Sequence, residues 1–534
     1  MFVDLRKLDN KNAFFCDVCV IGSGPAGCSI ALEFLNTSKN VIVLESGGEK
    51  LEPSTQELYK GETIGVSMPH PLDVSRKRFF GGSSNCWAGT SGFLDDIDFR
   101  KRPWVPYSGW PISKKELMPF YYRATKILEI KYPIFDDRLL ANLPEKIIPF
   151  SSQKLKTAFL RTSLMQYGNF GRKYRKHLED APNVRVILHA NVTDLKANGS
   201  ASRLEYVQIK SLGGKVGRVK AKVFVLACGG IENARILLYS NSVVPKGLGN
   251  ENDLVGRFFM DHIIVPAATI YTKKNSKQID LYNELRFGIR KPLLYRGQHF
   301  ATYIVLSEKM QRDNKLLNIG AFLADHPNEF SDALRASIRL RNFFMRQKIP
   351  KNSLADIWEV IKNLDEVLPA AYNRVFGGGG QFSRIAVKLQ IEQNPSPLSR
   401  VSLSKSRDAL GLNRTVLEWK LSKIERKTAE VMLQTLSSEF GRLGIARMKY
   451  DRWLNDPGKL FPEDLRGGQH HTGTTRMADD PKNGVVDRNC RVHSMKNLYI
   501  SGSSVFPTNG WIHPTLTICA LAIRLADHII NSRV

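Results

Sequence analysis

Two adjacent histidines stand in the segment QHHTGTTRMADD, residues 469–480. An imidazole has an unperturbed pKa of about 6.5, so a histidine can take up a proton at neutral pH. His470 and His471 suit three roles: ligands of a metal ion, a catalytic base, or polar residues of a turn. Adjacent side chains seldom converge on one ion, and no cysteine or carboxylate cluster surrounds the pair, so we expect no metal site.

A glycine-rich turn near the start of the chain has the pattern of a nucleotide-binding site. Residues 17–21, DVCVI, indicate a short buried strand, and Gly22, Gly24 and Gly27 then form G-x-G-x-x-G. An apolar helix of about three turns follows, and a second strand, VIVLE, ends at Glu45, 18 residues after the third glycine. A strand before the motif, a helix after it and an acid at this spacing make the pattern specific.

Each residue of this turn has a physical role in binding a dinucleotide. Gly22 permits the tight turn, Gly24 lets a pyrophosphate approach the backbone, and Gly27 lets the helix pack close to the strand. Free N–H groups at the helix start then face the phosphates. Glu45 would accept hydrogen bonds from ribose hydroxyls. Because NAD and FAD both use this unit, the motif alone leaves the choice between them open.

Later segments indicate further elements that position these residues. Residues 76–92, RKRFFGGSSNCWAGTSG, form a loop with many accessible backbone N–H groups. Strands are predicted for NVRVILHANVTDLKA and LEYVQIK, and residues 223–238 indicate a strand, a Gly-Gly turn and a helix. Near the end, KNLYISGSSVFPTNGWIHPTLTICALAIRLADHII indicates a strand, a glycine turn and a helix of four or five turns. That helix begins near Thr515, where its N–H groups can face a negative group.

These blocks together resemble the glucose–methanol–choline (GMC) family of FAD-dependent oxidoreductases. The matching segments are VIGSGPAG…VLESG, RFFGGSSNCWAG, SGWPISKKELMPFYYRA, LACGGIENARIL, LVGRFFMDH, HHTGTTRM and LYISGSSVFPTNGWIHPTLTICALAIRLADHI. They follow the family order from about residue 17 to 530, and the GGSSxxWxG form is similar to the pyranose oxidase and bacterial sugar-oxidoreductase branch. Seven ordered blocks are far more specific than any one of them.

The resemblance implies an α/β fold: a doubly wound, Rossmann-like FAD-binding domain interleaved with an α+β substrate domain on an antiparallel sheet. We expect the FAD-binding domain in residues 13–100, 185–262 and 462–534, and the substrate-binding or cap domain in 101–184 and 263–461. The sequence agrees with this division. FSRIAVKLQIEQN and SRVSLSK read as strands within 382–405, and residues 422–444 read as an amphipathic helix.

The resemblance also gives the histidines their expected roles. In the family, a base faces flavin N5 three residues before the Gly of the GT pair, a position that His470 occupies here. The matching partner residue is His513, in HPTLT, which we expect to hydrogen-bond the substrate hydroxyl. An alcohol is a weak acid, so hydride departs more easily when a base takes the hydroxyl proton at the same time. We expect His471 to be a packing or loop histidine beside this base.

The same resemblance assigns cofactor contacts along the chain. Pro514 and Thr515 match residues near the flavin N1/O2 edge, where negative charge grows on reduction, and Asn85 and Cys86 match the loop beside the isoalloxazine. We expect FAD to be bound non-covalently, with a thioether at Cys86 as the alternative. The full set of expected cofactor-binding residues is Gly22, Gly24, Pro25, Ala26, Gly27, Glu45, Ser46, Gly81, Gly82, Ser83, Asn85, Cys86, Val192, Ala227, Gly502, Ser503, Pro514 and Thr515.

Composition narrows the setting and the partners. The 534 residues carry a net charge of +27, which favours anionic partners or simply a solvated basic surface, and no nucleic-acid reader is recognised. Seven scattered cysteines indicate a reducing compartment, and no signal peptide or membrane span is expected, so we predict a cytoplasmic protein. Residues 335–351, RASIRLRNFFMRQKIPK, hold six basic residues and no acid. They suit an interfacial helix in peripheral contact with a membrane, or a lid or core helix.

The sequence therefore predicts an FAD-dependent enzyme that oxidises a CH–OH group of a sugar, polyol, glycoside or other alcohol. The electron acceptor is O2 or an external acceptor, and the sequence does not separate an oxidase from a dehydrogenase. The main alternative is a non-redox, flavin-containing lyase of the same fold, of the hydroxynitrile lyase type. An NAD-linked dehydrogenase would use the N-terminal motif alone, and the C-terminal strand and helix argue against it.

Overall fold

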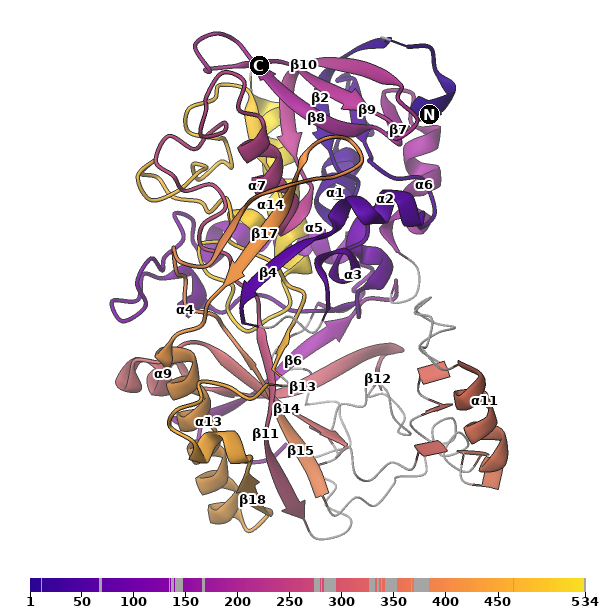
Figure 1. The fold of residues 1–534 in the computed structure, drawn as a ribbon. Coiled ribbons are helices and arrows are strands. Elements are labelled where there is room, and N and C mark those ends of the chain that lie inside the picture. Colours follow the sequence, from indigo (N-terminus) through magenta and orange to yellow (C-terminus); the bar gives the residue numbers. More distant parts are fainter. Residues whose placement is uncertain are drawn as a thin grey trace.

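The computed structural model of the chain describes most of its length. The described residues are 1–10, 12–66, 70–133, 135, 139, 147–165, 169–272, 279, 281–282, 294–325, 332–333, 336–337, 339–340, 353–365, 367–368, 384–463 and 465–532. Figure 1 shows these residues in two bodies, one above the other, and the chain crosses between the bodies several times.

The upper body of Figure 1 is built on a sheet whose central strands are parallel. The strand order is β1 (Phe2–Asp4), β7 (Val184–Leu188), β3 (Val41–Leu44), β2 (Asn12–Ile21), β10 (Val216–Leu226), β9 (Leu204–Lys210) and β8 (Asn191–Ala197), and β20 (Leu498–Ile500) also pairs with β10. β9 and β8 are antiparallel to their neighbours. Residues 18–21 of β2 are buried, as a continuous apolar run in a parallel sheet requires.

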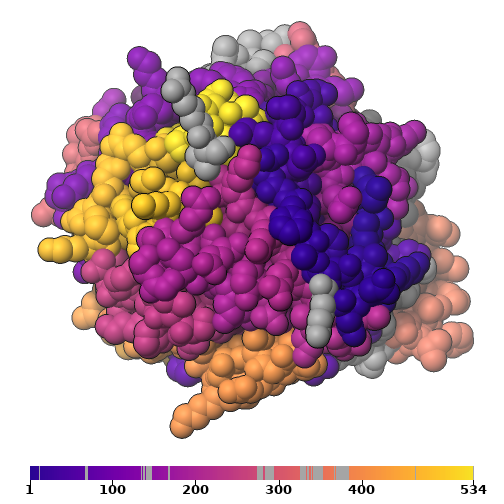
Figure 2. Space-filling view, turned by 90° about the horizontal axis from the view of Figure 1, so that it is seen from above, coloured from indigo at the N-terminus to yellow at the C-terminus, as the bar shows by residue number. Residues whose placement is uncertain are grey.

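Helices cover this sheet and bring the two ends of the chain together. They are α1 (Pro25–Glu33), α5 (Lys114–Ile127), α6 (Phe170–Asp180), α7 (Gly229–Tyr239) and α14 (Thr515–Asn531). α14 packs against both α1 and α5, and most of its Leu, Ile and Ala side chains are buried. Figure 2 shows segments from the start (indigo), the middle (magenta) and the end (yellow) of the chain meeting on the top face. The upper body is therefore assembled from segments that are far apart in the sequence.

The lower body is built on an antiparallel sheet. Its order is β18 (Ala446–Tyr450), β11 (Ile263–Thr272), β15 (Arg384–Ile391), β14 (Ile319–Asp325), β13 (Gln298–Leu306), β6 (Leu155–Thr162) and β5 (Thr90–Ser91), with β12 (Leu294–Tyr295) on β13 and β19 (Arg466–Gly467) on β11. α13 (Lys423–Leu443) packs against this sheet. The helix begins at a capping box of Ser422 and Glu425 and ends at Gly444, which has a left-handed backbone.

Smaller elements complete the described structure. A third sheet contains β16 (Arg400–Arg407), β17 (Asn413–Trp419) and β4 (Gly61–Gly65). The remaining α-helices are α2 (Pro53–Gln56), α3 (Leu72–Ser75), α4 (Asp96–Phe99), α9 (Glu308–Asn314) and α11 (Ser353–Lys362). Short 3-10 helices are η1 (Leu5–Lys7), η2 (Glu57–Tyr59), η3 (Gly82–Cys86), η6 (Arg452–Asn455) and η7 (Ser503–Val505).

The predicted fold class is confirmed: a doubly wound α/β unit is interleaved with an α+β unit on an antiparallel sheet. The strands predicted at 17–21, at 223–226 and near 498–500 are present, and so are the helices that follow each of them. The predicted domain boundaries remain a prediction. One strand within 13–100, β5, pairs with β6 of the second sheet, so that segment contributes to both bodies.

Two predictions concern segments of special composition. Most of the basic segment 335–351 lies outside the described residues, so its predicted interfacial or lid helix stays a prediction. In the described part of the chain, no helix has both the length and the apolar content needed to cross a membrane. Cys16 and Cys19 lie on β2. Each is a free cysteine.

Close packing of α1 on β2 gives a stability prediction. A Cβ added at Gly27 would lie 1.9 Å from the carbonyl oxygen of Gly22, so Gly27→Ala must push the helix away from the turn. We expect it to lower the free energy of unfolding by about 2 kcal/mol or more. The matched control is Gly441→Ala within α13, where the added methyl group has open space and the helix gains from alanine. Thermal unfolding of both variants measures this, and equal melting temperatures would contradict the packing argument.

Candidate functional site

A cavity of about 380 Å³ lies where the loops that follow β2, β3, β10 and β20 meet the first turn of α14. Ligands of open α/β sheets bind at this carboxyl edge of the parallel strands. Both predicted catalytic histidines line the cavity, and so do most of the predicted cofactor residues. These are Gly22, Gly24, Pro25, Ala26, Glu45, Ser46, Gly82, Ser83, Cys86, Val192, Ala227, Gly502, Ser503, Pro514 and Thr515.

Three of the predicted cofactor residues do not line the cavity, and each has a structural position instead. Gly27 faces the Gly22 turn, where only a glycine fits. Gly81 has a φ of +92°, and a Cβ there would lie 2.6 Å from the backbone nitrogen of Gly171. The side-chain amide of Asn85 donates to the carbonyl oxygens of Phe80 and Gly82, 3.1 and 2.7 Å away, and so closes the loop on itself. These three residues support the loops that line the cavity.

The Gly22 turn and the loop after β3 form one end of the cavity. Gly22 has a φ of +103°, and a Cβ there would lie 2.6 Å from the carbonyl oxygen of Ala227. α1 begins at Pro25, so the first backbone N–H groups of the helix are directed at the cavity end. The buried Glu45 carboxylate accepts hydrogen bonds from the Ser23 backbone, 3.2 Å away, and the Gly47 backbone, 2.9 Å away. These bonds fix the acid at the edge of the nucleotide turn.

Another part of the cavity lining comes from the start of α14 and from a group of histidines. α14 is capped at Pro514, and its residues Pro514, Thr515 and Ile518 line the cavity. A helix of this length carries a partial positive charge at its start. His513 directly precedes this helix, and its ring packs edge-to-face on His470, with ring centroids 4.9 Å apart. The two predicted catalytic residues, 43 positions apart in the chain, are therefore neighbours on one wall.

A third histidine, His262, contacts the ring of His470. The Nδ1 atoms of the two rings are 2.8 Å apart, and Nε2 of His262 lies 2.8 Å from the carbonyl oxygen of Gly510. His262 is completely buried, and burial lowers its pKa to about 4. This ring is therefore neutral at physiological pH. The segment that contains it, LVGRFFMDH, was noted in the sequence, but no pattern there indicated a contact with His470.

The carboxylate of Asp261 holds the backbone of this histidine group. It accepts hydrogen bonds from the backbone nitrogens of His470, His262 and Gln469 at 2.7, 2.8 and 3.1 Å. Burial raises the pKa of Asp261 to about 7, and these backbone donors oppose that rise. Since the carboxylate bonds both segments, the peptide that carries His470 is fixed relative to the peptide that carries His262.

His471 differs from its neighbour in its surroundings. Its ring packs against Phe259, with centroids 5.7 Å apart, and it is 7% exposed. Burial lowers its pKa to about 3, so it stays neutral. It also borders the cavity, and its Nε2 has no hydrogen-bond partner among the described residues. The contact with Phe259 agrees with the packing position that the sequence predicted.

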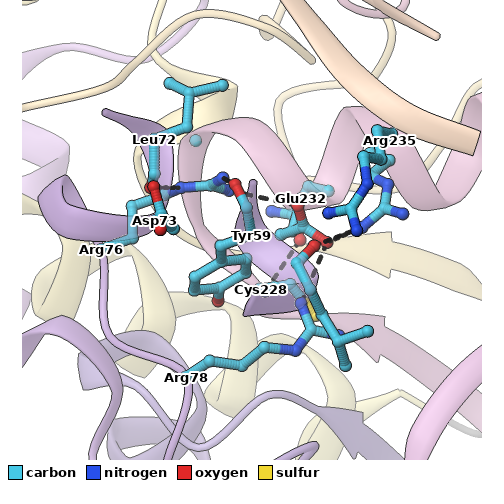
Figure 3. Close-up of polar contacts among 12 residues, drawn as sticks. Tyr59, Leu72, Asp73, Arg76, Arg78, Cys228, Glu232 and Arg235 are labelled. Atoms are coloured by element: carbon cyan, nitrogen blue, oxygen red, sulfur yellow. Dashed lines mark hydrogen bonds and ion pairs between the residues drawn. The ribbon is translucent and has the colours of Figure 1, made fainter. Parts of the chain in front are cut away.

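A cluster of arginines forms one wall of the cavity. Figure 3 shows Arg76, Arg78 and Arg235 gathered around Glu232. The guanidinium carbons of Arg76 and Arg78 lie 4.0 and 4.7 Å from the centre of the Tyr59 ring. Arg76, Arg78 and Arg235 all reach the Glu232 carboxylate, at distances of 3.1 to 3.4 Å. Burial alone would raise the pKa of Glu232, but these three cations outweigh it and lower the pKa to about 2.

Sequence reasoning missed these wall residues. The basic run RKR at 76–78 was visible before the GGSS loop, and it is the one signal that pointed to a charged wall. Tyr59 and Glu232 lie in segments with no chemical pattern, and Arg235 looked like an ordinary residue of a helix. Among the described residues, no group of three or more His, Cys, Asp or Glu side chains is arranged to hold a metal ion. The absence of a metal in the working protein stays a prediction.

Glu232 gives a prediction about stability. In Glu232→Gln, three buried guanidinium groups lose their shared counter-charge, so we expect a loss of about 3 kcal/mol in the free energy of unfolding. Glu57→Gln is the matched control, because Glu57 is 52% exposed and pairs with an exposed lysine. Thermal unfolding at pH 7 compares the two. If Glu57→Gln lost as much stability as Glu232→Gln, the buried cluster would have no special role in stability.

The depressed pKa of Glu232 also predicts how this difference varies with pH. Its folded-state pKa of about 2 lies below the ordinary value of 4.5, so its stabilisation is complete above about pH 4.5 and is lost as the pH falls towards 2. The gap in melting temperature between wild type and Glu232→Gln should therefore be constant from pH 7 to 5 and narrow at lower pH. A gap that widened on acidification would contradict the assignment.

Comparison of the sequence with known proteins shows which of them this chain is similar to. Residues 395–522 match the family model described as GMC oxidoreductase. The chain is 26% identical to the fructose dehydrogenase large subunit of Gluconobacter japonicus over 353 residues, 65% of this chain and 53% of that protein. It is 23% identical to 2-methyl-1,2-propanediol dehydrogenase of Mycolicibacterium austroafricanum, and the alignment covers 96% of this chain and 95% of that one.

A solved structure has the same fold. It is pyridoxine 4-oxidase from Mesorbium loti, with a TM-score of 0.55 at 16% identity, covering 96% of this chain and 99% of the other. At that identity the similarity concerns the fold. The family model, the two relatives and the shared fold agree with the cavity described above: residues 395–522 match the GMC oxidoreductase model, and the chain as a whole is similar to dehydrogenases and to an oxidase of this fold.

Proposed function

We propose that this enzyme oxidises the CH–OH group of a small alcohol, polyol or sugar to a carbonyl and transfers hydride to FAD bound in the cavity. The observation that carries the proposal is the contact of His470 and His513 on the cavity wall, between the nucleotide turn and the start of α14. A base and a second polar ring at one point of the wall suit removal of a hydroxyl proton. The family relationship supports the reaction class.

The residues of the cavity fit FAD. Glycines line it at Gly22, Gly24, Gly82, Gly229 and Gly502, so backbone amides are accessible to a ligand. Buried donors in its wall, Trp87 Nε1 and Arg78 Nε, have no partner among the described residues. The turn and α1 would hold the pyrophosphate, Glu45 the ribose, and α14 the flavin edge. Bound FAD supplies a two-electron acceptor, and non-covalent binding is part of the proposal.

The protein's own part in the reaction is acid–base chemistry and charge stabilisation. His470 takes the hydroxyl proton of the substrate, and His513 donates a hydrogen bond to the same oxygen and orients it. The start of α14 stabilises negative charge that develops next to Pro514 and Thr515. Cys86 also borders the cavity, and its thiol donates to the carbonyl oxygen of Ser83, 3.3 Å away.

The non-redox lyase is the less favoured alternative, because both relatives are named as dehydrogenases. The fructose and 2-methyl-1,2-propanediol in their names suggest sugars and short diols as the first compounds to test. The acceptor, O2 or an external one, and the cytoplasmic location remain parts of the proposal. The similarity to the pyranose oxidase branch also remains a prediction.

The first experiment follows the flavin band at about 450 nm under anaerobic conditions while sugars, polyols and aromatic alcohols are added. We expect one class of donor to bleach the band, and readmission of air then separates an oxidase from a dehydrogenase. A yellow protein that reacts with none of them would favour the lyase. A protein that cannot be loaded with FAD would overturn the proposal.

His470→Ala tests the base. The variant should retain bound flavin but lose about 10²- to 10⁴-fold in the rate of flavin reduction, which is the usual contribution of a general base. The control is His177→Ala, since His177 is exposed on α6. Stopped-flow absorbance measures both variants. A near-normal rate in His470→Ala would remove the base assignment.

Peripheral membrane contact through residues 335–351 also belongs to this proposal. The neighbouring helix α11 leaves Leu354, Trp358 and Ile361 exposed at 82%, 66% and 52%, and the basic run precedes it in the sequence. We expect the protein to co-sediment with vesicles of phosphatidylglycerol more than with vesicles of phosphatidylcholine. Trp358→Ala and neutralisation of Arg341, Arg346 and Lys348 should both reduce this. Equal sedimentation with both lipids would leave the segment without a membrane role.

A further inference from the structure

The contact between His262 and His470 determines which nitrogen of His470 carries the lone pair. We propose that His262 is a positioning residue that fixes the tautomer of His470, so that Nε2 of His470 is the basic atom. This inference deepens the proposed function and rests on it. It assigns a role to His262, a buried histidine that is 208 residues from His470 in the sequence.

The hydrogen bonds of His262 leave one arrangement of protons. Its Nε2 faces two carbonyl oxygens, of Gly510 at 2.8 Å and of Asn509 at 3.3 Å, and a carbonyl oxygen can only accept. Nε2 of His262 therefore carries a proton. A neutral imidazole has one N–H, so Nδ1 of His262 is an acceptor. The Nδ1 of His470, 2.8 Å away, must then be the donor.

His262 stays neutral because of where it lies. It is fully buried, and burial lowers its pKa to about 4. The charged and titratable groups around the pair come from several elements. Asp261 bonds the backbone of both histidines, His513 packs on the His470 ring, and Glu392, at the end of β15, is paired with Arg102 at 2.6 Å.

The consequence for the reaction is a base that is ready before substrate binds. With its proton held on Nδ1, neutral His470 keeps the lone pair on Nε2, and the hydroxyl proton of the substrate moves to that atom. His470 is then a cation whose Nδ1–H still donates to His262. Because that hydrogen bond strengthens when its donor becomes charged, His262 raises the affinity of His470 for the proton. The ring need not rotate during the cycle.

The proton positions can be observed directly. Neutron diffraction from FAD-loaded crystals exchanged into D2O at pH 7 should show deuterium on Nε2 of His262 and on Nδ1 of His470. This measurement needs no substrate, so it tests the inference even if no alcohol reduces the flavin. Deuterium on Nδ1 of His262, or an Nε2-deuterated neutral His470, would overturn the proposal.

Two nearly isosteric variants separate the hydrogen bond from packing. His262→Asn keeps an oxygen acceptor near the position of Nδ1, whereas His262→Leu has a similar size and no acceptor. Both lose the donor to Gly510. We expect both to bind FAD. His262→Leu should lose about 10- to 100-fold in the rate of flavin reduction, by analogy with groups that orient a catalytic histidine, and His262→Asn should stay within about fivefold of wild type.

The pH profile supplies a readout that a purely structural role would not change. The acid limb of kcat/KM reports the pKa of the free-enzyme base, and it should move down by about one pH unit in His262→Leu, since the imidazolium loses a charge-assisted hydrogen bond. In His262→Asn the acid limb of kcat/KM should lie at its wild-type pH. Reactions use the first donor that bleaches the wild-type flavin. Equal rates and profiles in both variants would refute the positioning role and leave His470 as the base, whereas a wild-type flavin that no donor reduces would refute the proposed function alone.

Discussion

The carboxylate of Asp261 joins two segments that are about two hundred residues apart, and the arrangement of the site depends on this junction. It accepts from the backbone of His262 on one segment and of His470 on the other. Backbone hydrogen bonds between Met260 and Thr472 extend the contact on one side, and the bond from Gly468 to His262 extends it on the other. Without a buried acceptor here, two peptides with unpaired N–H groups would have to lie next to each other, which is costly.

This junction connects the sheet of the upper body with that of the lower body. His262 immediately precedes β11 of the antiparallel sheet, and the Gly510 carbonyl that it bonds belongs to the loop between β20 and α14. The histidine group therefore lies at the point where both bodies contribute to the cavity wall. A displacement of either body would change the His262–His470 distance, so the packing of the whole chain affects the geometry of the proposed base.

In the arginine wall of the cavity, the cost of burying charged groups is set against their pairing with acids. Three guanidinium groups share Glu232, and Arg235 has Asp408 as a second partner 2.7 Å away. Burying these charges costs solvation energy, which only close pairing offsets. The wall thus keeps positive charge close to Glu45 without leaving isolated cations. The three guanidinium groups and the carboxylates of Glu232 and Asp408 together leave one positive charge in this wall.

The sequence alone determined the features that depend on local order. The strand–glycine turn–helix at residues 17–33 could be predicted because the spacing of its glycines allows few other conformations, and Gly22 has the positive φ that the turn needs. The start of α14 was predicted from the same kind of pattern, a strand followed by a glycine turn and a helix. The ordered blocks gave the family resemblance and, through it, the candidate pair His470 and His513.

Only the tertiary structure decided which residues complete the site. His262, Tyr59 and Glu232 carry no local signal, because their effect depends on partners that are distant in the sequence. Gly27, Gly81 and Asn85 hold the loops next to the cavity through close packing and hydrogen bonds, an arrangement that the motifs do not specify, and their predicted contact with a cofactor stays a prediction. Spacing fixes a backbone conformation over a few residues, but the proton on a buried imidazole depends on which atoms the complete fold places beside it.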